Sequence, residues 1–483
     1  MHLNNRWRDW QYLLLGLLPF LFVAGILFLS DPLVHSDEAL FVDEAKRWLE
    51  YGQLNTTLLG DAVFGLDKIA VWYPPLYFWI LGGWVKLFRP EIEAVRYLSL
   101  LVATFAIITT YFLGKSIFTS RRLALLATLL VATDYFFGRS GRIGRMDILC
   151  FTFMSVGYFI IFQKKNLSLT RLFLAGVFMG MALFSHPIGL IGIITIVAML
   201  FFYTKGWLIR ISKIIVFGLP SVLPFTLWLV SLLPNWEIFI RQWGLQISRK
   251  SQLTTYVFSL WQSGQWFWPI LFSVYAISFV LAIYFFMKEK SKIGFFLVFG
   301  FFVSTIMLLY GKEMYYPLYF QPFAALMLVW IYSKIRTYSP KLTVVSSGLV
   351  GIVFLVNFQL FSLTNQIYTG RNQNYYAYGQ AIMNNLPKKG RIYLSALPDP
   401  YFVLQHQKEL EFYEFPPLYT TDSQYYTMLD ESDYVVYNQL FDPRLELYLK
   451  LNKKSIVVPK QSGNYDITLY RLKPKTQRHW PEK

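Results

Sequence analysis

Long apolar stretches separated by short polar loops fill the first three quarters of the chain. Stretches of about 17–25 apolar residues recur, the length that a helix needs to cross the hydrocarbon core of a bilayer. The pattern predicts eleven membrane-spanning helices, at residues 11–29, 93–114, 123–138, 147–163, 171–185, 187–203, 214–233, 266–287, 293–310, 317–333 and 343–363. One further apolar segment, 74–88, begins with Pro74-Pro75, is short and is rich in Trp and Tyr. We expect it to lie in the membrane interface.

Basic residues in the loops set the predicted orientation of these helices. If segment 74–88 does not cross the membrane, five loops on the side of the N-terminus carry clusters of Lys and Arg, with Glu289 as their only acid. Basic loops remain on the cytoplasmic side, so the N-terminus is predicted to be cytoplasmic and the C-terminus to lie outside. The outer loops 138–147 and 234–265 also carry arginines, against the general bias. This exception is reasonable where an anionic group must be held.

The chain becomes more polar after about residue 364 and contains no further spanning stretch. Runs rich in β-branched and aromatic residues predict short strands at 392–396, 434–437, 456–458 and 467–472, and helices are predicted at 375–385, 401–407 and 443–451. The alternation indicates a small extracytoplasmic α/β domain at 364–483, following a transmembrane domain at 1–363. We expect it to stabilise the protein or to dock an acceptor.

Composition supports a polytopic α-helical membrane protein. Of the 483 residues, 55% are hydrophobic and only 15% are charged, which is too apolar for a soluble protein of this length. The net charge of +17 resides mainly in short loops between apolar segments, so it indicates membrane topology and not a nucleic-acid partner. The single cysteine, Cys150, cannot form an internal disulfide, so it does not indicate the compartment.

Two acidic positions in two outer loops carry the candidate chemistry. Asp37 and Glu38 follow the first span, and Asp147 ends the basic run that contains Arg142 and Arg145. If both loops face the same side, the carboxylates and arginines can converge on one site that performs acid/base chemistry on a phosphate-linked substrate. Guanidinium groups suit phosphate because their fork of donors matches its oxygens. The simpler interpretation is a set of solvated carboxylates and interfacial arginines.

Other outer-face residues are candidates for contacts to the same phosphate. They are Lys68, His186, Lys312 and Tyr315. For His186, a structural role between two spans is the simpler interpretation. The sequence contains no CxxC, HExxH, Walker loop or GxSxG in a fitting context, so zinc-site, nucleotide and serine-hydrolase functions have no support.

Several of these motifs together resemble the GT-C glycosyltransferases. The resemblance rests on Asp37-Glu38-Ala-Leu-Phe41, on Tyr73-Pro74-Pro75, on Arg96, and on the segment from Arg142 to Asp147. The nearest branch is the superfamily of protein mannosyltransferases and lipid A aminoarabinose transferases. That second branch typically has a lysine directly before Pro-Pro, where this chain has Tyr73, so the sugar is left open.

The resemblance implies an enzyme of a bacterial inner membrane that acts on the extracytoplasmic face. Its donor would be a polyprenyl-phosphate-linked sugar, its acceptor a lipid, glycan or protein, and membrane lipids would surround it. It implies Asp37 as catalytic base, with Glu38 and Asp147 beside it. Arg142, Arg145 and Lys312 with Tyr315 would hold the donor phosphate.

No cofactor is required by this mechanism, and a divalent metal bridging Asp37 and Asp147 is an alternative. Two other classes of protein are alternatives to the enzyme. One is a lipid or glycan transporter or flippase, which would place charges within spans near the midplane. The other is a noncatalytic scaffold or receptor that acts through the C-terminal domain.

Overall fold

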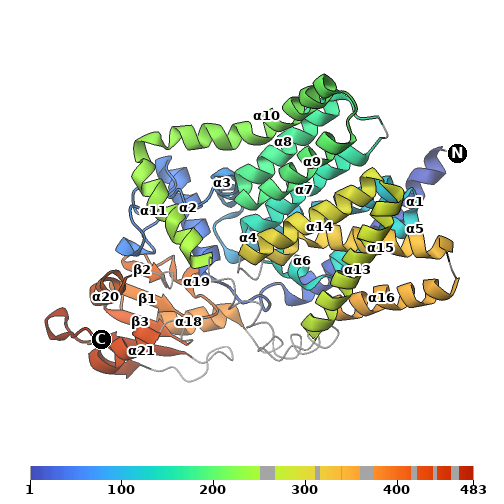
Figure 1. Cartoon of the computed structure of the whole chain (residues 1–483). Coiled ribbons are helices and arrows are strands. Elements are labelled where there is room, and N and C mark those ends of the chain that lie inside the picture. Colours follow the sequence, from blue (N-terminus) through green and yellow to red (C-terminus); the bar gives the residue numbers. More distant parts are fainter. Residues whose placement is uncertain are drawn as a thin grey trace.

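A helical bundle and a small α/β region lie side by side in the computed structural model (Figure 1). The structure describes residues 2–164, 166–250, 267–310, 316–338, 340–358, 374–414, 421–438, 443–457 and 467–481. The fold class predicted from the sequence is confirmed: the protein is mostly helical, with several apolar helices and a small C-terminal sheet.

Each predicted span overlaps a helix of the bundle. These helices are α1 (His2–Leu27), α4 (Ile92–Phe118), α5 (Arg121–Ala132), α7 (Met146–Phe162), α8 (Leu169–Ser185), α9 (Leu190–Tyr203), α10 (Trp207–Ser231), α13 (Phe267–Glu289), α14 (Lys292–Tyr310), α15 (Gln321–Tyr338) and α16 (Pro340–Phe358). Within the described residues, four stretches are long and apolar enough to cross a membrane by themselves: Trp7–Leu27, Ile92–Phe118, Trp207–Ser231 and Ile270–Glu289. Predicted residues 359–363 lie outside the described residues.

The predicted continuous span at 123–138 is wrong, because the chain breaks there into two helices. Helix α5 ends at Ala132, and the short helix α6 (Tyr135–Ser140) begins after Asp134. The Asp134 side chain accepts a hydrogen bond from the backbone N–H of Phe137 at 2.8 Å. This N-cap starts the new helix α6, so that α5 does not continue beyond Ala132.

Two helices lie against the end of the bundle, in the loop that was predicted to be the first outer one and is called the first outer loop below. They are α2 (Ser36–Tyr51) and α3 (Leu76–Phe88). Helix α3 has 13 residues, which gives a length of about 20 Å at 1.5 Å per residue. That is shorter than the hydrocarbon core of about 30 Å. The two helices meet through the rings of Phe41 and Phe78, whose centroids are 5.5 Å apart.

The C-terminal region contains a five-stranded mixed sheet in the order β2-β1-β3-β5-β4. Its elements are α18 (Tyr375–Asn385), β1 (Gly390–Ser395), α19 (Tyr401–Leu404), β2 (Leu410–Glu414), α20 (Asp422–Glu431), β3 (Tyr434–Tyr437), α21 (Pro443–Asn452), β4 (Lys453–Val457) and β5 (Thr468–Leu472). Strand β1 runs parallel to β2 and β3, while β5 is antiparallel to β3 and β4. Strand β2 and helix α20 were not predicted.

One hydrophobic core joins this region to the first outer loop. It includes Phe41 of α2 and Phe78 of α3 together with Tyr378, Ile392 and Phe412 of the C-terminal region. Backbone hydrogen bonds add to the contact, since Glu414 N–H donates to the carbonyl of Leu58 at 2.6 Å. The C-terminal region therefore braces the loop that carries Asp37.

Candidate active site

The start of helix α2 presents Asp37 and buries its neighbour Glu38. His35 is the N-cap: its Nδ1 accepts a hydrogen bond from Asp37 N–H at 3.2 Å, and Glu38 Oε2 accepts one from His35 N–H at 3.1 Å. This reciprocal capping box fixes the first turn of the helix. The Asp37 side chain remains 24% exposed, whereas Glu38 is fully buried.

Glu38 joins three segments of the chain. Its carboxylate accepts two hydrogen bonds from Arg96 of α4, from Nε at 3.0 Å and from Nη2 at 2.8 Å. It also accepts one from the backbone N–H of Gly144 at 2.8 Å. A side chain at Gly144 would lie 2.2 Å from Val95, so only glycine fits this close approach. The two predicted loops therefore meet here, through a fully bonded carboxylate.

Arg145 connects Asp37 with Asp147. Its Nη1 contacts Asp37 Oδ2, and its Nε donates to Asp147 Oδ2 at 3.0 Å. Asp147, in the first turn of α7, also accepts a hydrogen bond from Tyr319 Oη at 3.2 Å. Three predicted site residues thus form one continuous group, and two of them, Arg145 and Asp147, are buried.

Arg142 lies apart from this group and binds Asp31. Its Nε donates to the Asp31 carbonyl and its Nη2 to the Asp31 carboxylate, both at 3.0 Å. Burial lowers the pKa of Arg142, and the adjacent Asp31 carboxylate opposes that shift. Two of the donors that were predicted to hold a phosphate are therefore occupied by an acid that the sequence did not single out.

His186 lies among three tyrosine rings, one of which belongs to Tyr319, the partner of Asp147. Its ring centroid lies 5.8 Å from Tyr73, 5.5 Å from Tyr316 and 6.1 Å from Tyr319. Its Nδ1 accepts a hydrogen bond from Ile188 N–H at 3.2 Å and caps the short helix η2 (Pro187–Gly189). The structural role expected of this histidine is present, and it adjoins the candidate site.

Lys68 is a predicted phosphate contact that the structure does not place at the acidic group. Lys68 is exposed on a loop held by helix α11 (Trp236–Lys250), whose Gln242 binds the backbone of Phe64, Ile69 and Val71. No contact joins Lys68 to the acidic group within the described residues. Lys312 and Tyr315 lie outside the described residues.

Tyr77 of α3 is a site residue that the sequence reasoning missed. Its side chain is buried, and within the described part of the chain its hydroxyl has no hydrogen-bond partner. Burial raises the pKa of Tyr77 well above its ordinary value, and the nearby Glu38 and Asp147 carboxylates raise it further. The sequence offered one clue to this role, because Tyr77 follows Pro74-Pro75 by two residues on the segment predicted to lie in the interface.

The acidic group does not fit a bridging metal ion. The Arg145 guanidinium already links Asp37 and Asp147, in the position that a bridging cation would need. Among the described residues, no three His, Cys, Asp or Glu side chains are arranged to hold a metal ion.

A cavity of about 530 Å³ lies between α2 and the C-terminal region. Asp43, Lys46 and Arg47 of α2 line one side, and Arg391 of β1 and Tyr401 of α19 line the other. Asp43 binds Tyr401 Oη at 3.2 Å, so the two walls are in contact.

Comparison with known proteins identifies the class to which this architecture corresponds. The sequence model of the family described as dolichyl-phosphate-mannose-protein mannosyltransferase matches residues 73–229. That segment contains Arg142, Arg145, Asp147 and His186 and begins after Asp37. No functionally curated protein matches the chain in sequence at a significant level.

Solved structures share the fold of this chain. ArnT from Cupriavidus metallidurans, solved bound to undecaprenyl phosphate, superposes with a TM-score of 0.60 and 13% identity, covering 94% of this chain and 97% of that chain. The apo oligosaccharyltransferase of Archaeoglobus fulgidus gives a TM-score of 0.53 with 11% identity over 88% of this chain and 69% of its own. Its complex with Zn and sulfate gives 0.54 with 12% identity, over 87% and 67%. The fold that the resemblance implied is thereby confirmed, since the chain has the fold of these solved proteins.

Proposed function

We propose that this protein transfers a sugar from a polyprenyl-phosphate-linked donor to an acceptor hydroxyl on the extracytoplasmic face of a bacterial inner membrane, with Asp37 as general base. The observation that carries the proposal is the group formed by Asp37, Arg145 and Asp147. It contains one accessible carboxylate, held by a buried guanidinium that a second, buried carboxylate fixes.

Asp37 is the base in the proposed reaction. It accepts the proton of the acceptor hydroxyl while the oxygen of that hydroxyl attacks the anomeric carbon of the donor sugar. The bond from that carbon to the phosphate oxygen breaks, and polyprenyl phosphate leaves with the electron pair. A single displacement of this kind inverts the anomeric configuration. General-base assistance contributes about 10²–10⁴-fold to the rate.

Arg145 and Glu38 support this chemistry in different ways. The Arg145 guanidinium is the cation nearest to Asp37 and is the first candidate to stabilise charge on the leaving phosphate. Glu38 is a positioning residue, because all its oxygens are engaged by Arg96, His35 and Gly144. Tyr77 is the remaining donor, with a buried hydroxyl that a substrate oxygen can engage.

The lipid carrier is inferred from the fold and from the placement of charge. ArnT of the same fold was solved with undecaprenyl phosphate, and the charges here lie at helix ends and not at mid-span. The latter observation favours an enzyme over a transporter, which places ionisable groups near the midplane.

Transfer from a radiolabelled donor tests the proposal. Purified protein is incubated with a panel of polyprenyl-phosphate sugars and a membrane extract, and release of polyprenyl phosphate is measured together with label on an acceptor. Asp37→Asn should lower turnover by about 10²–10⁴-fold while donor binding persists. Asp67→Asn, an exposed acid of the same loop, is the matched control and should retain turnover. Normal turnover in Asp37→Asn would show that another group is the base, and movement of intact donor across liposomes without transfer would establish a flippase.

A further inference from the structure

A second site lies at the end of the bundle opposite to the acidic group. Helix α7 begins beside Asp147 and ends at Phe162, so its 17 residues separate the two ends by about 25 Å. Helices α4 and α9 connect the same two ends. In α4, Arg96 lies toward the acidic group and Phe112 lines a cavity at the far end. In α9, Leu190 lies toward the acidic group and Met199 lines both far cavities. The charge pattern of the loops predicts that this far end is cytoplasmic.

Two adjoining cavities open at this end. The smaller, of about 310 Å³, is lined by Tyr203 at the end of α9, by Lys213 of α10 and by Lys292 at the start of α14. The larger, of about 700 Å³, has apolar walls that include Phe112 and Phe159. They share Leu167, Met199 and Lys292, so a single ligand can occupy both.

The charge of these cavities is positive throughout. Among the residues that the structure describes, no acidic side chain lines them, whereas four lysines do: Lys115, Lys164, Lys213 and Lys292. Lys115 is paired with Asp9 at 2.5 Å. Within the described part of the chain, the amino groups of Lys164, Lys213 and Lys292 have no ion pair or hydrogen bond.

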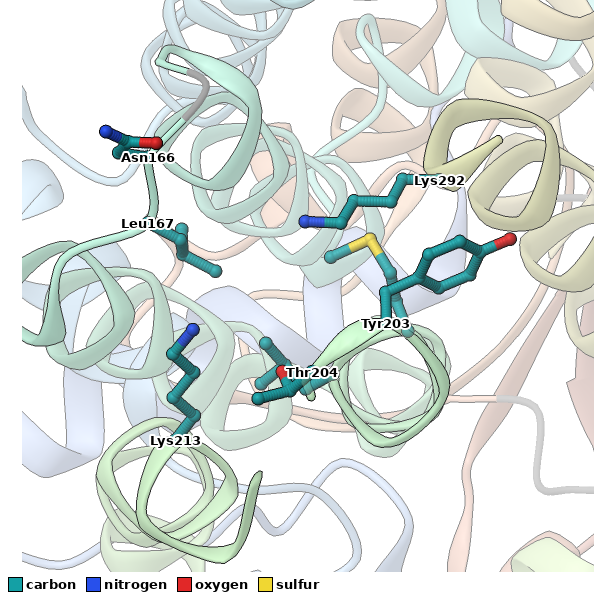
Figure 2. A pocket seen from close by; sticks show the side chains of 8 residues that line it. Asn166, Leu167, Tyr203, Thr204, Lys213 and Lys292 are labelled. Carbon is teal, nitrogen blue, oxygen red and sulfur yellow. The ribbon is translucent and has the colours of Figure 1, made fainter. Parts of the chain in front are cut away.

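Figure 2 shows the amino groups of Lys213 and Lys292 extending from different helices toward the space between them. The Tyr203 hydroxyl points away from that space, in agreement with its hydrogen bonds to the carbonyls of Lys290 at 3.1 Å and Ser291 at 3.2 Å. Two like charges face each other across an open cavity, and an anion between them would relieve their repulsion.

From this arrangement we infer that the paired cavities bind an anionic phospholipid. The phosphate headgroup lies between Lys213 and Lys292 in the smaller cavity, and an acyl chain lies against the phenylalanines of the larger one. An inorganic phosphate would use only the first half of such a site. Basic pockets between transmembrane helices on the cytoplasmic side are suited to anionic lipid headgroups, and each Lys near such a surface is worth about 1 kcal/mol. The inference does not depend on the proposed glycosyl transfer.

Native mass spectrometry of the full chain in detergent tests the site, with dioctanoyl phosphatidylglycerol as the probe. Lys213→Gln with Lys292→Gln should weaken binding by about 25-fold, which is about fivefold for each lysine. Lys205→Gln is the matched control, since Lys205 is exposed at the same end of the bundle and lines neither cavity. It should change binding by less than about twofold.

Two further measurements distinguish binding of a whole anionic lipid from binding of a phosphate group alone. Ser116→Trp fills part of the larger cavity alone without changing charge, and it should abolish lipid binding while leaving any binding of inorganic phosphate unchanged. Dioctanoyl phosphatidylcholine should bind much more weakly than the phosphatidylglycerol. Equal binding by the double variant and the native protein would overturn the inference. So would equal binding of the two lipids, or inorganic phosphate occupying the site as tightly as phosphatidylglycerol.

Discussion

At the scale of single residues, the two adjacent acids of α2 have opposite environments. Asp37 is partly exposed and contacts Arg145, with His35 Nδ1 at 3.9 Å, while Glu38 is fully buried and accepts four hydrogen bonds. One position can exchange a proton with a substrate, and the other is committed to holding three segments together. Sequence reasoning placed both acids in the candidate catalytic site and took Asp37 as the base only from the family resemblance.

Glu38→Gln should therefore destabilise the protein, unlike Asp37→Asn. Removing one charge of a buried pair leaves Arg96 uncompensated, at a cost of about 3–5 kcal/mol. We expect a much lower thermal midpoint for purified Glu38→Gln and a midpoint near the native value for Asp37→Asn, measured in the same detergent. A Glu38→Gln protein with native stability but no turnover would instead assign Glu38 to the chemistry.

Tyr77→Phe provides the converse case, a change that spares stability and affects binding. A buried hydroxyl without a partner costs about 1–3 kcal/mol, so its removal should leave the thermal midpoint unchanged or higher. If the hydroxyl binds substrate, KM for the donor should rise by about fivefold or more, since one hydrogen bond contributes about 1 kcal/mol. Tyr378→Phe is the control, because its hydroxyl donates to the Pro398 carbonyl at 2.9 Å and its loss should lower the midpoint without changing KM. An unchanged KM in Tyr77→Phe would remove this residue from the binding site.

Sequence reasoning singled out the acids, Arg142 and Arg145, but it did not indicate that Arg142 is paired with Asp31. The partner of Arg142 is Asp31, which is 111 positions away in the sequence. Such pairing depends on how close two loops come in space, and no local pattern records it. For the same reason, the sequence did not indicate that Tyr319 binds Asp147, which is 172 positions away.

At the scale of elements, strand β2 explains why the C-terminal sheet was only partly predicted. Its sequence, Leu-Glu-Phe-Tyr-Glu, contains no β-branched residue and two glutamates, so its propensity is weak. The strand forms because β1 pairs with it in parallel and because Leu410 and Phe412 enter the shared core. Strand β3, with Val435 and Val436, had the stronger local signal and was predicted with the observed bounds.

The contact between this sheet and the first outer loop contains a pair of buried acids, Asp399 and Glu414. Burial raises the pKa of Asp399 to about 6, and burial together with Asp399 raises that of Glu414 well above its ordinary value. Their neighbours Asp43 and Glu38 are also acidic, and Asp399 N–H donates to the Val34 carbonyl at 2.8 Å. The pair thus lies where the C-terminal region binds the loop before Asp37.

These raised pKa values predict that the contact weakens as pH rises. Between the unfolded-state pKa of about 4 and the folded value of about 6, the unfolded chain releases a proton that the folded chain retains. Stability therefore falls through that window, and the penalty persists above it. The penalty in the free energy of unfolding is on the order of 2 kcal/mol. Asp399→Asn removes it and should therefore raise the thermal midpoint at pH 7.5 by several degrees and reduce the pH dependence of the midpoint.

Glu409→Gln, an exposed change on the same connection, is the control and should keep the native pH dependence. The measurement is the thermal midpoint of the three proteins at several values between pH 4.5 and 7.5. If Asp399→Asn lowers the midpoint at pH 7.5, the carboxyl pair is ionised and otherwise compensated in the folded protein.

At the scale of the whole molecule, the bundle has a chemical polarity from one end to the other. The acidic group and the C-terminal region occupy one end, and the lysine-lined cavities occupy the other. Hydropathy and charge predicted this arrangement well, because a bilayer imposes both span length and the side on which basic loops remain. They did not predict that the C-terminal region shares a core with α2 and α3, since that contact is ordinary hydrophobic packing between distant segments.

The position of α3 decides whether this polarity corresponds to the two faces of the membrane. Its length of about 20 Å and its exposed Leu87 and Phe88 favour a helix in the interface, with both of its ends on the outer side. Cysteine labelling tests this directly. The native Cys150 is buried and should not react. Lys68→Cys and Arg89→Cys, before and after α3, should both react with a membrane-impermeant maleimide on intact cells.

The same reagent should label Lys408→Cys from outside and should label Lys205→Cys only after the cells are permeabilised. This matched pair replaces an exposed lysine at each end of the molecule. If Lys68→Cys and Arg89→Cys react from opposite sides, α3 crosses the membrane and every later loop changes side. Yet Gly144 N–H binds Glu38, and Arg145 binds Asp37. A crossing α3 would have to separate these bonded groups, so labelling of both cysteines from one side is the outcome that the site itself requires.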